Sequence, residues 1–273
     1  MSLSNRSVRV VVSVIAIPLI LLICFYGKIP FLFLTLIIGL VSFYEFGVMN
    51  RNKENFVNRI PGLLSVGIII LNSYEHFIDF NNLVLAIVPL LLILELFRNR
   101  TSAINNLGST LLGIFYIGLF SAALLGVREF YSNSELVYSR GGLVIISMLI
   151  TIWVCDSAAY FLGTAFGKHK LFPRVSPNKS WEGAIAGFVF SIITVIALKS
   201  LLLDFFDWAD IIVFGVIVGI AGQSGDLIES LIKRDAGVKD SSALIPGHGG
   251  IFDRFDSVLY TSPLLLLYMT YFM

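Results

Sequence analysis

The sequence predicts an all-α, polytopic integral membrane protein with about nine transmembrane helices. Of its 273 residues, 57% are apolar and only 14% are charged, whereas a soluble domain carries about 25% charged residues. The apolar residues form long uninterrupted runs, and about 20 apolar residues in a helix cross the hydrocarbon core of a bilayer. Together these two observations exclude a soluble globular protein.

Nine apolar runs follow one another along the chain. They cover residues 8–26, 29–48, 60–78, 81–97, 107–127, 141–166, 182–203, 210–232 and 257–273. The first run lacks a small-x-small cleavage site and a second run follows at once, so we expect an uncleaved helix rather than a secretion signal. No polar linker separates a soluble domain. We therefore expect one membrane domain, with residues 1–140 as scaffold, lipid-access or oligomer-contact helices and residues 141–273 forming the catalytic site.

The distribution of Lys and Arg predicts the orientation, because these residues accumulate in short cytoplasmic loops. With nine spans and a cytoplasmic N-terminus, 15 of the 19 basic residues fall on the cytoplasmic side. Only Lys28, Arg128, Arg140 and Lys199 fall outside. The C-terminus is then outside, and both long polar stretches, 167–181 and 233–256, face the cytoplasm, where nucleoside triphosphates are available.

Carboxylates inside the apolar runs are the first candidates for function. Asp156 interrupts the sixth run, and Asp226 and Glu229 lie in the eighth. A charge at mid-membrane costs about 2.5–3.5 kcal/mol on insertion scales. On a helix, Asp226, Glu229, Ser230 and Lys233 share one face. A structural alternative is an ion pair between Glu229 and Lys233, with Asp226 capping a break at Gly225, but the whole face favours a cation site.

Asp253 and Asp256 stand three residues apart at the start of the ninth run. On a helix that spacing points both carboxylates the same way. Mg²⁺ is held by one or two carboxylates together with water and substrate phosphates. The alternative is that both residues only complement the dipole at a helix N-terminus, which does not account for the glycines and basic residues beside them.

Two polar loops carry anion-binding features. The loop from Lys239 to Gly250 contains Gly247-His248-Gly249-Gly250, and glycines let backbone N–H groups approach an anion closely. Most such loops are only turns, and a lone histidine is more often structural than catalytic. In the other loop Ser180 can cap the seventh helix, where Lys179 would meet a phosphate; the alternative is a plain helix start with a basic flank.

These residues resemble a known family. Ser230-Leu231-Ile232-Lys233-Arg234, Lys239-Asp240 and the stretch from Ile245 to Asp256 are similar to the signature of phosphatidate cytidylyltransferases, the CDP-diacylglycerol synthases. Upstream, the stretches 156–163 and 176–183 also resemble blocks of this family. One departure is Asn178, where relatives usually carry lysine, which puts a phosphate contact at that position in doubt. The resemblance covers roughly residues 150–273.

The resemblance implies a Mg²⁺-dependent reaction, with a second cation also compatible, in which CTP and phosphatidic acid give CDP-diacylglycerol and pyrophosphate. It implies the lipid bilayer and a second copy of the chain as partners, no nucleic acid, and a location in the inner (cytoplasmic) membrane. The metal-binding acids fall on Asp226 and Asp253, with Asp256 and Glu229 as further candidates. Expected catalytic residues are Asp226, Asp253, Lys233, Arg254 and Asp256. Expected substrate-binding residues are Asp156, Ser176, Asn178, Lys179, Ser180, Lys239, Asp240, His248, Gly249 and Gly250.

Three rival functions fit parts of the pattern. A CTP-dependent kinase of a polyprenol-type alcohol would also span the membrane and face the cytoplasm. An ion-coupled transporter would place its acids near the midplane and show inverted repeats, and neither is seen in the sequence. A CDP-alcohol phosphotransferase would need an arrangement of four-spaced aspartates that is absent here.

Overall fold

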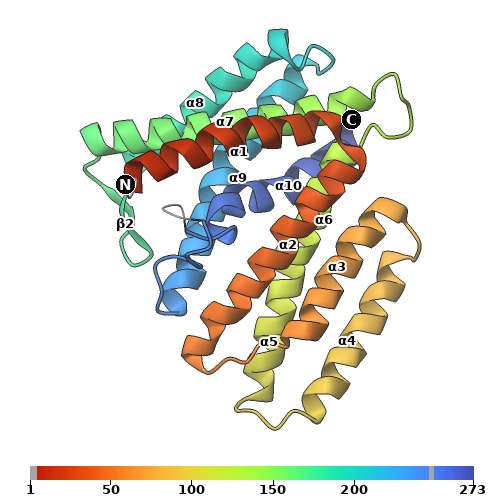
Figure 1. Cartoon of the computed structure of the whole chain (residues 1–273). Helices are drawn as coiled ribbons and strands as arrows, with labels where there is room; N and C mark the ends of the chain where they lie inside the picture. Colours follow the sequence, from red (N-terminus) through yellow and green to blue (C-terminus); the bar gives the residue numbers. More distant parts are fainter. Residues whose placement is uncertain (1–4, 246–248) are drawn as a thin grey trace. The chain divides into compact units, whose positions relative to one another are not determined.

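The computed structural model describes residues 5–245 and 249–273, with side chains from Ser13 onward, and it is almost entirely α-helical (Figure 1). Each of the nine predicted spans coincides with a helical stretch. The elements are α1 (Asn5–Tyr26), α2 (Lys28–Asn50), η1 (Arg51–Lys53), α3 (Arg59–Glu75), α4 (Phe80–Leu96), α5 (Ala103–Gly113), the π-helical η2 (Ile114–Leu119), α6 (Phe120–Glu129), α7 (Tyr138–Phe166), β1 (Lys170–Phe172), β2 (Ser176–Ser180), α8 (Trp181–Leu201), α9 (Trp208–Asp235) and α10 (Phe252–Phe272).

Several helices are long and apolar enough to cross a membrane, which confirms the multi-pass class. Within the described residues there are five of them: Lys28–Lys53, Ala103–Glu129, Tyr138–Phe166, Trp181–Leu201 and Trp208–Asp235. The second of these consists of α5, η2 and α6, which follow one another without a gap. A total of nine spans, and the side on which each terminus lies, stay predictions.

The chain forms two compact units. Unit 1 contains Met1–Ile23, Lys28–Gly126 and Lys233–Phe255, and unit 2 contains Cys24–Gly27, Val127–Ile232 and Asp256–Met273. The segment Lys233–Phe255, which carries much of the family signature, therefore folds with the N-terminal helices rather than with its neighbours in sequence.

In unit 1, α3 packs against α2, η2 and α4 (Figure 1, orange to yellow-green). Phe43 of α2 is fully buried, and two glycines make room for its ring. A Cβ on Gly62 or on Gly113 would collide with that ring. Because interiors are close-packed, these glycines set how closely α3 and α5 approach α2.

A buried polar cluster joins the α2–α3 connection to α4 and α5 in unit 1. The carboxylate of Glu95, on α4, accepts hydrogen bonds from the side-chain amides of Asn58 at 2.9 Å and Asn106 at 2.7 Å. The guanidinium of Arg98 lies 3.4 Å from the same carboxylate. Glu95 is thus buried but satisfied, as a charge removed from water has to be.

In unit 2, α7 and α8 pack closely through small residues (Figure 1, green to teal). A Cβ on Gly183 would lie 2.7 Å from the carbonyl oxygen of Ala159, and one on Gly187 would lie 2.9 Å from that of Cys155. Glycine at these positions brings the two backbones close together, as small residues do between membrane helices.

The structure corrects one detail of the sequence prediction and excludes one of its alternatives. The stretch 167–181 is not a plain loop, because β1 and β2 pair antiparallel in it, with Lys170 opposite Ser180 and Phe172 opposite Ser176. The alternative of a helix break at Gly225 also fails, since α9 continues from Trp208 through Asp235. The hairpin escaped prediction because its strands are short and polar, without the apolar alternation that marks a half-buried strand.

Candidate active site

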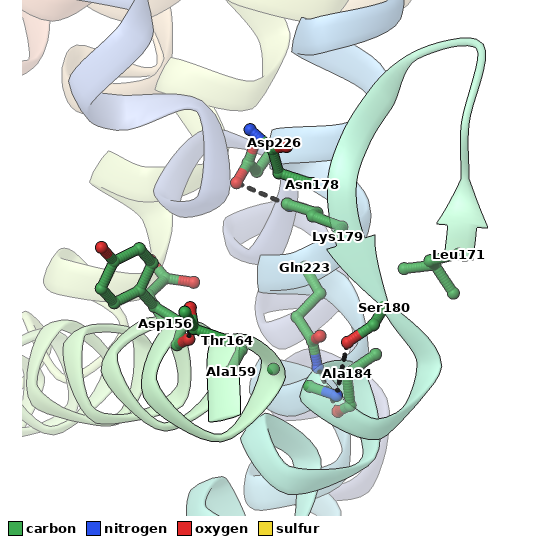
Figure 2. Close-up of a pocket in the computed structure, with 13 residues that line it drawn as sticks. Asp156, Ala159, Thr164, Leu171, Asn178, Lys179, Ser180, Ala184, Gln223 and Asp226 are labelled. Atoms are coloured by element: carbon green, nitrogen blue, oxygen red, sulfur yellow. Dashed lines mark hydrogen bonds and ion pairs between the residues drawn. The ribbon is translucent and has the colours of Figure 1, made fainter. Parts of the chain in front are cut away.

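A cavity of about 300 Å³ lies in unit 2, between α7, the β-hairpin, α8 and α9 (Figure 2). Five of its lining residues were predicted from the sequence to take part in the site: Asp156, Asn178, Lys179, Ser180 and Asp226. The full lining is Asp156, Ala159, Tyr160, Gly163, Thr164, Leu171, Asn178, Lys179, Ser180, Gly183, Ala184, Gln223 and Asp226. The fold thus brings together residues that lie up to 70 positions apart in the sequence.

An ion pair crosses this cavity. The Nζ of Lys179, near the end of β2, lies 2.7 Å from Oδ2 of Asp226 on α9 (Figure 2). The hydroxyl of Ser230, one turn along α9, donates to Oδ1 of Asp226 at 3.3 Å. The side chains of Lys179 and Asp226 remain 30% and 35% exposed. Because both are still open to the cavity, each can exchange its partner for a ligand.

Two further polar groups fix the walls of the cavity. Ser180 is the N-cap of α8, and its hydroxyl accepts a hydrogen bond from the N–H of Gly183 at 3.2 Å. This confirms the predicted cap and holds Lys179 at the positive end of α8. The side-chain amide of Gln223 donates to the carbonyl oxygens of Ala184 and Gly219, which ties α9 to α8.

Asp156 supplies a second carboxylate to the cavity, from α7 (Figure 2). Two acids and one lysine therefore line one small space. Repulsion between two carboxylates favours a bound cation there.

A second cluster lies in unit 1 around Asp253, in the first turn of α10. Oδ1 of Asp253 accepts a hydrogen bond from Nζ of Lys233 at 2.7 Å. Oδ2 accepts from the N–H of Ser241 at 2.9 Å, from its hydroxyl at 3.0 Å and from the N–H of Gly250 at 2.8 Å. The Asp253 side chain is only 4% exposed. Asp253 thus contacts both Lys233 and Gly250 within this unit, as their proximity in the sequence motif predicted.

The other two predicted metal ligands have different surroundings in unit 2. Gly225 lets α9 approach α10 at Asp256, because a Cβ on Gly225 would lie 2.8 Å from the carbonyl oxygen of Asp256. Asp226 and Asp256 therefore belong to adjoining turns of packed helices. Glu229 is fully buried and does not line the cavity. Whether Asp253 and Asp226 share one cation stays a prediction, since they belong to different units.

The remaining predicted residues lie in the polar segments. Lys239, Asp240 and Arg254 are exposed, and Ser176 begins β2. The carbonyl oxygen of Gly249 accepts from the N–H of Ile245, and Gly249 has a positive φ of 82°, which favours glycine. His248 lies outside the described residues.

The donor set suits Mg²⁺, although no three His, Cys, Asp or Glu side chains converge within the described part of the chain. Mg²⁺ keeps several waters and needs only one or two carboxylates when substrate phosphates complete its shell. Asp156 and Asp226 on the open cavity meet that requirement.

Three residues that contact the site or its supporting segments in the structure were not predicted from the sequence. Thr164 and Gln223 line the cavity. Glu45 in α2 is buried and accepts hydrogen bonds from the segment that precedes α10 and from its first residue, Phe252. A signal existed for Glu45, because it is a carboxylate inside the apolar run 29–48 and the cost of such a charge already marked Asp156.

Comparisons with known proteins identify the family of this chain. The sequence model of the cytidylyltransferase family matches residues 7–272. A phosphatidate cytidylyltransferase of Bacillus subtilis (strain 168) is 31% identical over 269 residues, which is 97% of each chain. One of Staphylococcus aureus (strain COL) is 36% identical over 267 residues, 94% of this chain and 96% of the relative. One of Staphylococcus saprophyticus is 32% identical over the same length. The chain belongs to the cytidylyltransferase family.

Proposed function

We infer that this protein is a phosphatidate cytidylyltransferase, which transfers the cytidylyl group of CTP to phosphatidic acid in phospholipid biosynthesis. The products are CDP-diacylglycerol and pyrophosphate. The observation that carries this inference is the cavity lined by Asp156, Lys179 and Asp226, in a chain that matches the family over residues 7–272. The near-complete alignment with relatives of that name supports the same activity.

The reaction requires little proton transfer from the protein. A phosphate oxygen of phosphatidic acid attacks the α-phosphorus of CTP, the new P–O bond forms, and the bond to the β-phosphate bridging oxygen breaks as pyrophosphate leaves. A phosphate monoester with a second pKa of about 6, as for phosphorylated side chains, is already largely ionised at neutral pH. The barrier is therefore mainly the repulsion between two anions, and positioning and charge neutralisation lower it.

Lysines supply part of this neutralisation. In the absence of substrate, Lys179 is held by Asp226 and Lys233 by Asp253, each pair at 2.7 Å. When phosphates enter, Lys179 can turn from Asp226 toward them, because the side chains of Lys179 and Asp226 remain partly exposed. Arg254 and Lys239 are exposed and are proposed to neutralise the leaving pyrophosphate.

Mg²⁺ is the proposed cofactor. Asp226, Asp156 and Asp256 of unit 2 would hold it, and the sequence signature adds Asp253, with Glu229 as a further candidate. A divalent cation there would neutralise charge on the reacting phosphates. Asp226 also holds Lys179 beside the cavity until phosphates enter.

The proposed setting is the inner (cytoplasmic) membrane, with nine spans, a cytoplasmic N-terminus and the site facing the cytoplasm. The 15-to-4 distribution of Lys and Arg supports this orientation. A homodimer is proposed from the resemblance alone.

The decisive experiment uses the purified full chain in detergent with CTP, phosphatidic acid and Mg²⁺. We expect pyrophosphate release and a lipid product that retains the α-phosphate of labelled CTP, with no release when ATP replaces CTP. Transfer of the γ-phosphate to a lipid alcohol would instead identify a kinase. Accumulation of a solute in proteoliposomes without any lipid product would identify a transporter, and either result would refute the inference.

A further inference from the structure

Glu45 is a buried carboxylate near the C-terminal end of a largely apolar helix. It lies in α2, in unit 1, and is only 2% exposed. Removing a carboxylate from water is costly unless hydrogen bonds replace the lost hydration. The contacts of Glu45 show which hydrogen bonds replace its lost hydration.

Both oxygens of Glu45 accept hydrogen bonds from the segment around Ser241 and Phe252. Oε1 accepts from the hydroxyl of Ser242 at 2.6 Å and from the N–H of Ile251 at 3.1 Å. Oε2 accepts from the hydroxyl of Ser241 at 3.0 Å and from the N–H of Phe252 at 2.9 Å. A carboxylate offers about four acceptor positions, and four donors of the protein lie within hydrogen-bond distance of Glu45.

Two of these donors belong to the start of α10. The first N–H groups of a helix have no partner within it and need an outside acceptor. Here the acceptor comes from a different helix, about 200 residues away in sequence. Glu45 therefore caps α10 from α2 and at the same time holds Ser241 and Ser242.

The same donors connect Glu45 to Asp253. The hydroxyl of Ser241 lies 3.0 Å from Oε2 of Glu45 and also 3.0 Å from Oδ2 of Asp253. One hydroxyl has one proton, so Ser241 donates to only one of the two carboxylates at a time. Gly250 completes the arrangement: its N–H donates to Asp253, and a Cβ at this position would collide with Ser241 and with the Glu45 carboxylate.

We propose that Glu45 is a positioning residue for the transfer reaction. From α2 it fixes Ser241–Ser242 and Ile251–Phe252, and through them it sets the orientation of the Asp253 carboxylate beside Lys233. This role rests on the proposed function, in which Asp253 takes part in binding the cation and phosphates. It gives an N-terminal helix a direct part in organising residues of the family signature.

The test compares Glu45→Gln with a matched control, Glu95→Gln. Both substitutions remove the charge of a buried, hydrogen-bonded glutamate in unit 1 and keep its shape, but Glu95 contacts Asn58, Asn106 and Arg98 rather than the Asp253 cluster. In Glu45→Gln the NH₂ that replaces one carboxylate oxygen cannot accept, so at least one N–H at the start of α10 loses its partner. Glu45→Asp keeps the charge and serves as the rescue variant.

We expect Glu45→Gln to lower kcat and to raise the Mg²⁺ concentration for half-maximal activity, each by about tenfold, as partners of ligating groups typically contribute. Hydrogen exchange should become faster at the amides of Ser241 and Gly250–Phe252. Glu95→Gln should lower the unfolding temperature in detergent but leave the Mg²⁺ dependence and this exchange unchanged. Glu45→Asp should recover part of the activity. All assays are run well below the lowest unfolding temperature.

Wild-type Mg²⁺ dependence in Glu45→Gln, or unchanged exchange at Ile251 and Phe252, would overturn the proposal. So would an equal effect of Glu95→Gln on the Mg²⁺ dependence, because that would indicate general destabilisation. The two proposals fail separately. If the wild-type chain makes no CDP-diacylglycerol, the proposed function fails, while the exchange measurement still decides whether Glu45 holds the loop.

Discussion

Two aspartate–lysine pairs in the described part of the chain have the same length and different surroundings. Lys179–Asp226 in unit 2 and Lys233–Asp253 in unit 1 both measure 2.7 Å. The side chains of the first pair are 30% and 35% exposed on an open cavity. Those of the second are 12% and 4% exposed, and three donors of Ser241 and Gly250 also lie within 3.0 Å of Asp253.

This difference separates a pair that can exchange ligands from one that is built into the fold. An exposed ion pair contributes about 0–1 kcal/mol to stability, so Asp226 and Lys179 can part at little cost. Breaking a buried pair by removing one partner costs about 3–5 kcal/mol. Asp253 should therefore contribute to both stability and catalysis. Asp226 should contribute to catalysis but very little to stability.

The largest effect is expected for Asp253→Asn. The amide can still accept from Ser241 and Gly250, but its NH₂ group then faces the ammonium of Lys233. Transfer should be lost and the free energy of unfolding should fall by about 3 kcal/mol, measured by denaturant unfolding in detergent. The double variant Asp253→Asn/Lys233→Met should regain stability without activity. A wild-type unfolding curve for Asp253→Asn would show that the buried pair is not structural.

Asp226→Asn should lower the activity without lowering the stability. Removing the charge of a group that acts on the reacting phosphates should lower kcat by at least about 100-fold, a typical loss for a single electrostatic contact in the transition state. The free energy of unfolding should change by less than about 1 kcal/mol. Turnover within a few-fold of wild type, in protein that folds normally, would exclude Asp226 from the cation site.

Lys179→Met should have the smallest effect of the three. Methionine keeps much of the length of lysine and removes its charge, so we expect the KM for CTP to rise about tenfold, equivalent to about 1.4 kcal/mol. Stability should be unchanged, and Lys179→Arg should keep most of the affinity because it keeps the charge. An unchanged KM would mean that Lys179 serves only as the counter-ion of Asp226.

Much of the local structure was predictable because it follows from local chemistry. The apolar runs predicted the helices, since backbone N–H and C=O groups inside a bilayer must form hydrogen bonds within their own segment. Ser180 was predicted as an N-cap and is one. The β1–β2 hairpin was not predicted, because its polar strands carry no periodic signal.

Longer-range relations were only partly predictable. The sequence motif grouped Asp253, Lys233 and Gly250, and the structure confirms their contacts. It could not indicate that Lys179 pairs with Asp226, since charge and spacing do not specify which helices become neighbours. It also gave no reason to connect Glu45 with Ser241, because those residues are about 200 positions apart.

The amino-acid sequence by itself determined that this is a helical membrane protein with the signature of a cytidylyltransferase, because hydrophobic length and motif spacing are local properties of the chain. Only the tertiary structure decided which acids are open and which are buried. Exposure depends on which helices pack together, and here close approaches at glycines such as Gly225 and Gly250 set that packing.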